Sequence, residues 1–199
     1  RAIVDALLNL DGRVHISIFL EACQNIGGMP ASIARQFLTK LAKIIQEDGE
    51  VGLLDALLLE RVKSELNLLP LHTPTALDEV KPQIVRLIDA LLHVQQINSG
   101  NQLEVREKIL QRVLTPYEMS LYEEISDEPI DLAEILNDMA GLLLRDRLSI
   151  LGIAEACLWN DRIITQDELD VLELLYWRLG FATEEMVERM QKKNSLMII

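Results

Sequence analysis

The sequence is poor in the residues on which many enzyme classes and disulfide-bonded proteins depend. Its 199 residues include 2 cysteines, 3 histidines and only 4% aromatic residues. Two cysteines, Cys23 and Cys157, are too few for a disulfide scaffold, so we expect buried free thiols in a reducing compartment. The histidines, His15, His72 and His93, are widely spaced and form no His-Glu-x-x-His motif. Because phosphate loops and redox Cys pairs are also missing, we expect no catalysis by this segment.

The chain also has little positive charge. Its formal net charge of −13 opposes binding to nucleic acid and to anionic membrane surfaces, so we expect neither partner. No run approaches the roughly 18 apolar residues of a membrane span, and no signal peptide is visible. The acidic balance is consistent with simple solubility or with affinity for divalent cations or basic partners. The chain begins inside a predicted helix, and we expect it to be part of a longer protein.

Apolar residues at helical spacing predict an all-α fold with no strand. The expected helices cover residues 1–10, 15–26, 30–46, 53–68, 82–97, 103–114, 131–144, 148–159, 166–179 and 183–192, with a short helix after Thr115. Residues 98–101 predict a loop, and nothing at 145–147 clearly breaks a helix. The prolines Pro70 and Pro74 predict a boundary between a half at 1–70 and a half at 71–199, with one continuous domain as the alternative.

An apolar stripe and a group of aromatic residues are expected to contribute to the core. In the helix at 30–46 we expect a set of inward-facing residues: Ile33, Phe37, Leu38, Leu41, Ile44 and Ile45. In the last hairpin, the aromatic residues Trp159, Tyr176 and Trp177 are expected to form core and rim. Cys157 lies on an apolar face without a basic neighbour, which predicts an inert thiol.

One stretch recurs later along the chain. Residues 44–59 end one apolar helix, turn at Asp48-Gly49 and begin another helix. Residues 157–169 follow the same plan through Asp161. Apolar positions match in phase on both sides of the turn, and Asp55 corresponds to Glu168. The pattern predicts a duplicated helix–turn–helix hairpin, and we call the alignment that pairs Asp48 with Asp161 the repeat register.

The Asp-Gly-x-apolar motif, with a carboxylate seven residues after the Asp, resembles the TerB-like helical domain of tellurite-resistance proteins. The layout is also similar to the carboxy-terminal region of bacterial membrane-bound M48-type zinc peptidases. The sequence departs from the family pattern where Arg162 follows Asp161 in place of Gly, and where Asp55 stands in place of the more common Glu.

This resemblance implies a TerB-like helical bundle that acts as a non-catalytic interaction or regulatory module. It also implies that the module is the soluble cytoplasmic part of a larger membrane-associated peptidase, tethered to the inner membrane. The partner would then be another protein or the peptidase's own membrane domain, received on the acidic hairpin surface. The alternative that the resemblance implies is a stand-alone stress-response protein that binds divalent ions.

Four carboxylates carry the metal prediction: Asp48, Asp55, Asp161 and Glu168. Seven residues across a tight turn can bring the turn Asp and the carboxylate of the next helix to one side of the helix start. Two such hairpins packed together would offer hard oxygen ligands to Ca²⁺ or Mg²⁺. Metal binding through acidic residues of this kind is also what the TerB resemblance implies.

Helix capping is the alternative role for these acids. Thr165-Gln166-Asp167-Glu168 is a capping box, in which the Thr hydroxyl and the Glu carboxylate satisfy free backbone N–H groups. Gly52 and Asp55 occupy the corresponding positions before the earlier helix. An EF-hand is excluded, because Leu172 stands where the twelfth loop position requires Glu. Capping and ion binding both remain open from the sequence.

Overall fold

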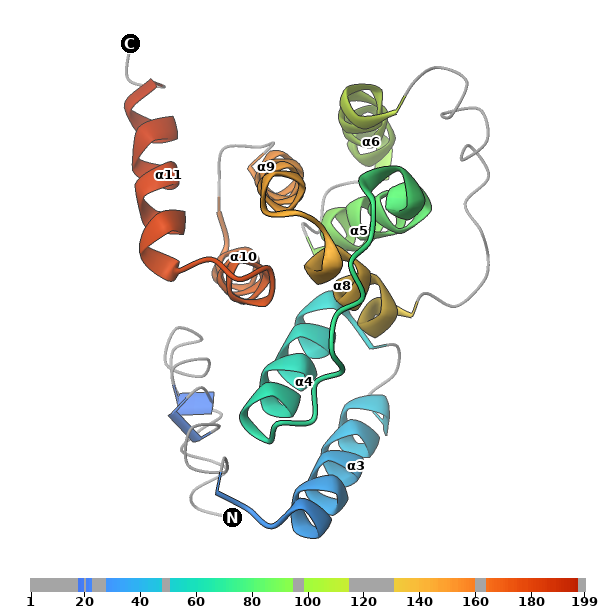
Figure 1. The fold of residues 1–199 in the computed structure, drawn as a ribbon. Helices are drawn as coiled ribbons and strands as arrows, with labels where there is room; N and C mark the ends of the chain where they lie inside the picture. The colour runs from blue at the N-terminus through green and yellow to red at the C-terminus, as the bar shows by residue number, and fades with distance from the viewer. Residues whose placement is uncertain are drawn as a thin grey trace.

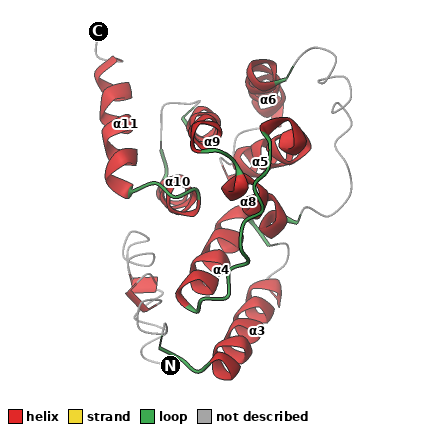
Figure 2. Ribbon diagram, viewed as in Figure 1, coloured by secondary structure: helices red, strands yellow, loops and turns green. Residues whose placement is uncertain are grey.

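The computed structural model describes residues 18–19, 21–22, 28–47, 51–94, 99–114, 131–159 and 164–196. All regular structure within these residues is helical, which confirms the all-α prediction (Figures 1 and 2). The predicted helices at 1–10 and after Thr115 lie outside the described residues. Of the predicted helix at 15–26, only residues 18–19 and 21–22 are described, and they are helical.

The described regular elements are all helices. Their bounds are α3 (Ala31–Glu47), α4 (Leu53–Glu65), η1 (Leu77–Val80, a 3-10 helix), α5 (Lys81–Val94), α6 (Ser99–Val113), α8 (Leu132–Gly141), α9 (Leu144–Leu158), α10 (Gln166–Arg178) and α11 (Thr183–Leu196). Within the described part of the chain, none of them combines the length and the apolar content that crossing a bilayer requires.

Helix α4 lies at the centre of the fold. It packs most extensively against α10 and also contacts α3, α5 and α8 (Figure 1). Helix α5 packs against α9 and is joined there by α6 and α8, while α11 packs against α10 at the edge. This arrangement sets α3 apart, because its main helix neighbour in the described chain is α4.

The main hydrophobic core runs from α4 to α11. Its fully buried side chains come from five different helices and include Leu57, Leu87, Leu136, Leu151 and Leu175. These residues lie on both sides of position 70, and the division into halves at 1–70 and 71–199 stays a prediction. A second, smaller cluster joins α3 to α4 through three buried residues, Ala34, Val62 and Leu66.

The break between α8 and α9 lies earlier than the sequence indicated. Helix α8 ends at Gly141 and α9 begins at Leu144, with extended backbone at Leu142 and Leu143 between them. A Cβ atom at Gly141 would lie 2.3 Å from the carbonyl oxygen of Thr73, so only glycine fits there. The Thr75 N–H also donates to the Gly141 carbonyl at 3.1 Å. These two contacts with residues 73–75 determine where α8 ends.

Helix α6 begins at Ser99, so the loop predicted at 98–101 is wrong for the last three of those residues. Serine and asparagine favour helix starts as well as loops, because their side chains can accept hydrogen bonds from free backbone N–H groups. The composition of residues 98–101 therefore indicated a helix boundary, but it did not indicate that the last three of these residues belong to the helix.

Candidate functional site

The Asp55 carboxylate occupies the third position of α4 and caps that helix. Its Oδ2 atom accepts a hydrogen bond from the Gly52 N–H at 3.1 Å. Gly52 has no side chain to return the bond, so half of a capping box is present. The side chain is half-buried, and its pairing with the backbone gives Asp55 a structural role without an ion.

The Glu168 carboxylate has the same place in α10. Its Oε2 atom accepts from the Thr165 N–H at 2.6 Å and from the Thr165 hydroxyl at 2.9 Å. The Glu168 N–H donates to that hydroxyl at 3.3 Å, which completes the capping box. Glu168 is only 2% exposed. Glu168 therefore contributes no exposed charge to an acidic hairpin surface.

The structure describes only two of the four residues that were predicted to bind a metal ion. Asp48 and Asp161 lie outside the described residues, so the convergence of Asp48, Asp55, Asp161 and Glu168 stays a prediction. Among the described residues, no group of three or more His, Cys, Asp or Glu side chains is placed to hold a metal ion. Calorimetric titration with Ca²⁺ and Mg²⁺ tests the four-residue site directly.

A buried ion pair joins α4 to α10. The Arg178 Nε donates to Glu60 Oε2 at 3.1 Å, with the two side chains 2% and 3% exposed. Lys63 donates to the other Glu60 oxygen at 2.7 Å. Arg178 Nη1 lies 3.3 Å from His72 Nε2, and His72 Nδ1 lies 3.2 Å from Asn137 Oδ1. The network connects α4, α8, α10 and the segment before η1, and holds these elements in register.

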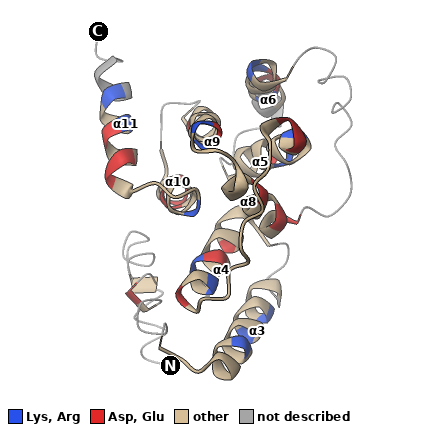
Figure 3. Ribbon diagram, in the orientation of Figure 1, with Lys and Arg blue, Asp and Glu red and all other residues tan. Residues whose placement is uncertain are grey.

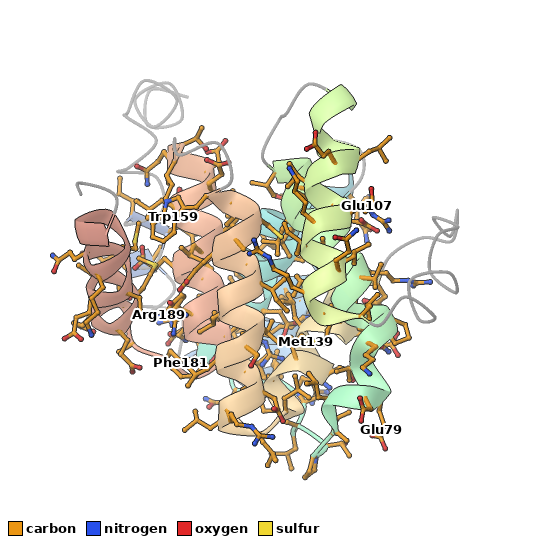
Figure 4. All side chains as sticks on the ribbon, turned by 90° about the horizontal axis from the view of Figure 1, so that it is seen from above. Glu79, Glu107, Met139, Trp159, Phe181 and Arg189 are labelled. Carbon is orange, nitrogen blue, oxygen red and sulfur yellow. The ribbon has the colours of Figure 1, made fainter. Side chains whose placement is uncertain are left out.

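A second buried carboxylate, Glu155, joins α9 to α10 and α11. It is 1% exposed and accepts a hydrogen bond from the Tyr176 hydroxyl. Arg189, labelled in Figure 4, donates to both Glu155 oxygens at 2.8 and 3.2 Å. Burial, together with the hydrogen bond to Glu155, raises the pKa of Tyr176. The phenol therefore remains protonated at neutral pH, and the cluster fastens α11 to the body.

These buried charges escaped the sequence analysis. Glu60 and Glu155 each lie among apolar residues on the inward phase of a helix, and that position was the available signal. Their partners, Arg178 and Arg189, lie 118 and 34 residues away, so no local pattern connects them. Each carboxylate is paired, as burial of a charge requires. We find a structural role for both.

The predictions for the aromatic residues and for Cys157 are confirmed. Tyr176 is fully buried, while Trp159 and Trp177 are half-buried. The Arg61 guanidinium lies 4.7 Å from the ring centre of Trp177, within the range of a cation–π contact. Cys157 is a buried free thiol, and burial, reinforced by the charge of Asp89, raises its pKa to about 12. At neutral pH it remains the unreactive thiol.

The bounds of the helices match in the repeat register. The first and last residues of α4 pair with the first and last residues of α10, and the first residue of α3 pairs with the first residue of α9. The caps also match. Gly52 and Thr165 are both extended, with φ of −74° and −77°. Past the ends of α4 and α10, Asn67 and Gly180 both have positive φ, at 54° and 84°.

The hydrogen bonds that end α4 and α10 are equivalent as well. The Leu68 N–H donates to the Lys63 carbonyl at 2.8 Å, and the Phe181 N–H donates to the Tyr176 carbonyl at 2.9 Å. This six-residue closure, with a positive φ inside it, is a Schellman motif. Both helices are therefore stopped in the same way.

The surroundings of α3 and α9 differ. On α3, three residues that were expected to face inward are exposed: Ile33 by 51%, Phe37 by 37% and Ile44 by 60%. That expectation was wrong for these three, while Leu38, Leu41 and Ile45 are half-buried as part of the predicted face. The equivalent residues on α9, Asp146, Ile150 and Cys157, are exposed by 8%, 1% and 0%.

A groove of about 400 Å³ lies between η1, α5, α6 and α9. It is lined by Ile84 of α5, Ile109 and Arg112 of α6, and Ile150 and Ile153 of α9. The lining is mainly apolar, and it contains no group of acids, histidines or thiols that would support catalysis. The lining residues show that α5 and α6 cover this side of α9.

Comparison of the chain with family models, with curated proteins and with solved structures found no match in any of the three. The functional argument therefore depends on the molecule itself.

Proposed function

We propose that this chain is a non-catalytic helical module that binds a protein partner through the exposed apolar side of α3. One observation carries the proposal. Ile33, Phe37 and Ile44 are exposed on α3, whereas the equivalent residues of α9 in the repeat register are buried. Contiguous exposed apolar side chains on a soluble protein are typical of a surface that another protein covers.

The proposal includes a TerB-like bundle built from a duplicated hairpin. Support comes from the matched bounds of α4 and α10 and from their equivalent extended N-caps. The matched Schellman closures at their ends support it further. In this interpretation α3–α4 and α9–α10 are two copies of one unit, and only the second copy has its outer side covered by α5.

Site-specific photo-crosslinking tests the interaction role. A benzophenone amino acid replaces Ile44 in the full chain, which is then expressed in bacterial cells and irradiated. The matched control carries the same amino acid in place of Leu103 on α6, which is 65% exposed but far from α3 in sequence. We expect a defined protein adduct from position 44 and none from position 103. Equal adducts from both positions, or none from position 44, would count against the proposal.

The resemblance to the M48-type peptidases supports a narrower form of the proposal. The module would then serve a bacterial membrane-associated peptidase from the cytoplasmic side and receive its partner or the membrane domain on α3. The test is the coding sequence upstream of Arg1. A His-Glu-x-x-His helix and membrane spans in the same reading frame are the expected result, and an in-frame start codon directly before this segment would contradict it.

A further inference from the structure

Four residues define a continuous feature that we call the α3 strip: Ile33, Phe37, Lys40 and Ile44. Their spacing of four, three and four residues places them on one face of the helix. All four side chains are exposed. The neighbouring face, with Ala34 and Leu41, packs against α4 in the small cluster. Among the residues that the structure describes, the α3 strip is thus the uncovered half of a wide apolar face.

The second half of the molecule shows what covers the equivalent face. The α3 strip corresponds to Asp146, Ile150, Ile153 and Cys157 on α9. Helix α5 packs along α9, and its Ile84 lines the same groove as Ile150 and Ile153. At the other end of the face, the charge of Asp89 on α5 contributes to the raised pKa of Cys157. The face of α9 is therefore covered by α5, which packs along it, together with α6, which lines the same groove through Ile109.

The covering helix presents a regular apolar stripe. Ile84, Leu87, Ile88 and Leu91 of α5 follow helical spacing, and each is 0–1% exposed. A helix of about four turns with such a stripe is long enough to contact a face that extends from Ile33 to Ile44 of α3. The same type of ligand is a common partner for a helical groove or face in proteins.

Charge distinguishes the α3 strip from its counterpart on α9. Position 40 carries a lysine where α9 has Ile153, and three of the four charged residues of α3 are basic: Arg35, Lys40 and Lys43, with Glu47 at its last position. Figure 3 shows this basic character against the acidic and mixed helices elsewhere. Because opposite charges across an interface select the partner, a helix lying on the α3 strip should place carboxylates beside Lys40.

We infer that the α3 strip receives an acidic amphipathic helix of a partner protein, which lies along α3 as α5 lies along α9. This inference rests on the proposed interaction role and adds the chemistry and shape of the partner. A second copy of the chain is the weaker candidate, because two α3 strips face to face would bring their basic residues together. A membrane surface is also less suitable, since the net charge of −13 opposes anionic lipid and half of the apolar face of α3 is already buried against α4.

A designed peptide tests the inference. It carries the α5 sequence from Lys81 to Val94 with Lys81→Glu and Arg86→Glu, a fluorescent label and a lactam bridge on its solvent side to hold it helical. Binding to the full chain is followed by fluorescence anisotropy. We expect saturable binding that weakens at least tenfold in Ile44→Ser. The control variant Leu103→Ser, an exposed apolar residue on α6, should bind as the unchanged chain does.

A charge swap tests the acidic character. Lys40→Glu should weaken binding of the acidic peptide severalfold, and binding should recover with the peptide that keeps Lys81 and Arg86. Equal affinity of the Ile44→Ser variant or of the Lys40→Glu variant for the acidic peptide would overturn the inference. Dimerisation of the full chain that Ile44→Ser abolishes, or Ile44-dependent binding to phosphatidylglycerol vesicles, would overturn it in favour of a second copy or a membrane.

The two proposals fail in different ways. If position 44 crosslinks to a protein in cells but the acidic peptide does not bind, the interaction role stands and the acidic helix is wrong. If position 44 gives no adduct and the peptide does not bind, both are wrong.

Discussion

The α3–α4 pair and the α9–α10 pair have equivalent helix starts and helix-end hydrogen bonds but different surroundings. The starts of all four helices, the caps and the closures correspond in the repeat register. Yet Phe37 on α3 is 37% exposed, while Ile150 at the equivalent place on α9 is 1% exposed. Short-range signals therefore determine where these helices begin and end, whereas the elements that pack on a helix determine which of its apolar residues become core.

The side chains also show where the two pairs have diverged. Position 57 in α4 is a fully buried leucine, and the equivalent position in α10 is Asp170, which is 5% exposed. Gly52 caps α4 without a side chain, whereas Thr165 caps α10 with its hydroxyl.

The largest effect is expected at the ion pair between Glu60 of α4 and Arg178 of α10. This ion pair has no counterpart in which the two helices exchange roles. Glu60→Ala should destabilise the protein by about 3–5 kcal/mol, because it leaves the buried Arg178 without its carboxylate. The matched control is Glu173→Ala, at the equivalent position of α10, where we expect a loss below about 1 kcal/mol. Urea denaturation measures both. Equal losses would show that the ion pair does not distinguish the hairpins.

The next prediction compares the covered and uncovered faces directly. Ile150→Ala should cost about 2–5 kcal/mol, because it leaves a cavity under α5 and α6. Phe37→Ala removes a larger side chain but should cost about 1 kcal/mol or less, because that ring is already partly in water. Thermal unfolding of the two variants measures the difference. A loss at Phe37 as large as the loss at Ile150 would show that α3 is as well covered as α9.

Those two predictions also show what the sequence could and could not predict. Helical spacing predicted the helices, and the repeat register correctly placed the caps at Asp55 and Glu168, because caps and periodicity depend on neighbours within a few residues. Burial at Ile33 and Ile44 was wrongly predicted, since an apolar stripe does not state whether another helix covers it. The partner of Glu60 lies 118 residues away, beyond any local pattern.

A smaller effect is expected at the two N-caps. Thr165→Ala should cost about 1 kcal/mol, because the Glu168 N–H loses its hydroxyl acceptor. Gly52→Ser should gain about 0.5–1 kcal/mol, since the backbone there is extended and serine adds a capping hydroxyl. A Cβ atom at Gly52 meets nothing closer than Asp55 Oδ2 at 3.5 Å, so the added side chain fits. Loss of stability in Gly52→Ser would mean that the two caps are not interchangeable.

The smallest effect concerns the acid in the core position of α10. Burial raises the pKa of Asp170 above its ordinary value of 3.8, although the Gln166 amide donates to its Oδ1 at 2.6 Å and opposes the shift. Between the ordinary and the raised value the folded state holds more protons than the unfolded state, so this group makes stability fall as the pH rises through that window. At neutral pH the charged Asp170 carboxylate therefore lowers the free energy of unfolding. Leu57, at the equivalent position of α4, has no such effect.

Asp170→Asn should remove that cost and keep the acceptor for Gln166. We expect its melting temperature at pH 7 to exceed that of the unchanged protein by about 1–3 °C, and the gain to vanish as the pH falls below the ordinary pKa of an aspartate. Asp167→Asn, one turn earlier on the exposed side of α10, should lose a few tenths of a kcal/mol, because it removes a negative charge from the helix start. If Asp170→Asn raises stability at pH 7 and Asp167→Asn lowers it, the pH dependence of stability arises at the buried residue. A gain for Asp170→Asn that persists at pH 3 would instead show that size or packing, and not charge, separates α10 from α4 at this position.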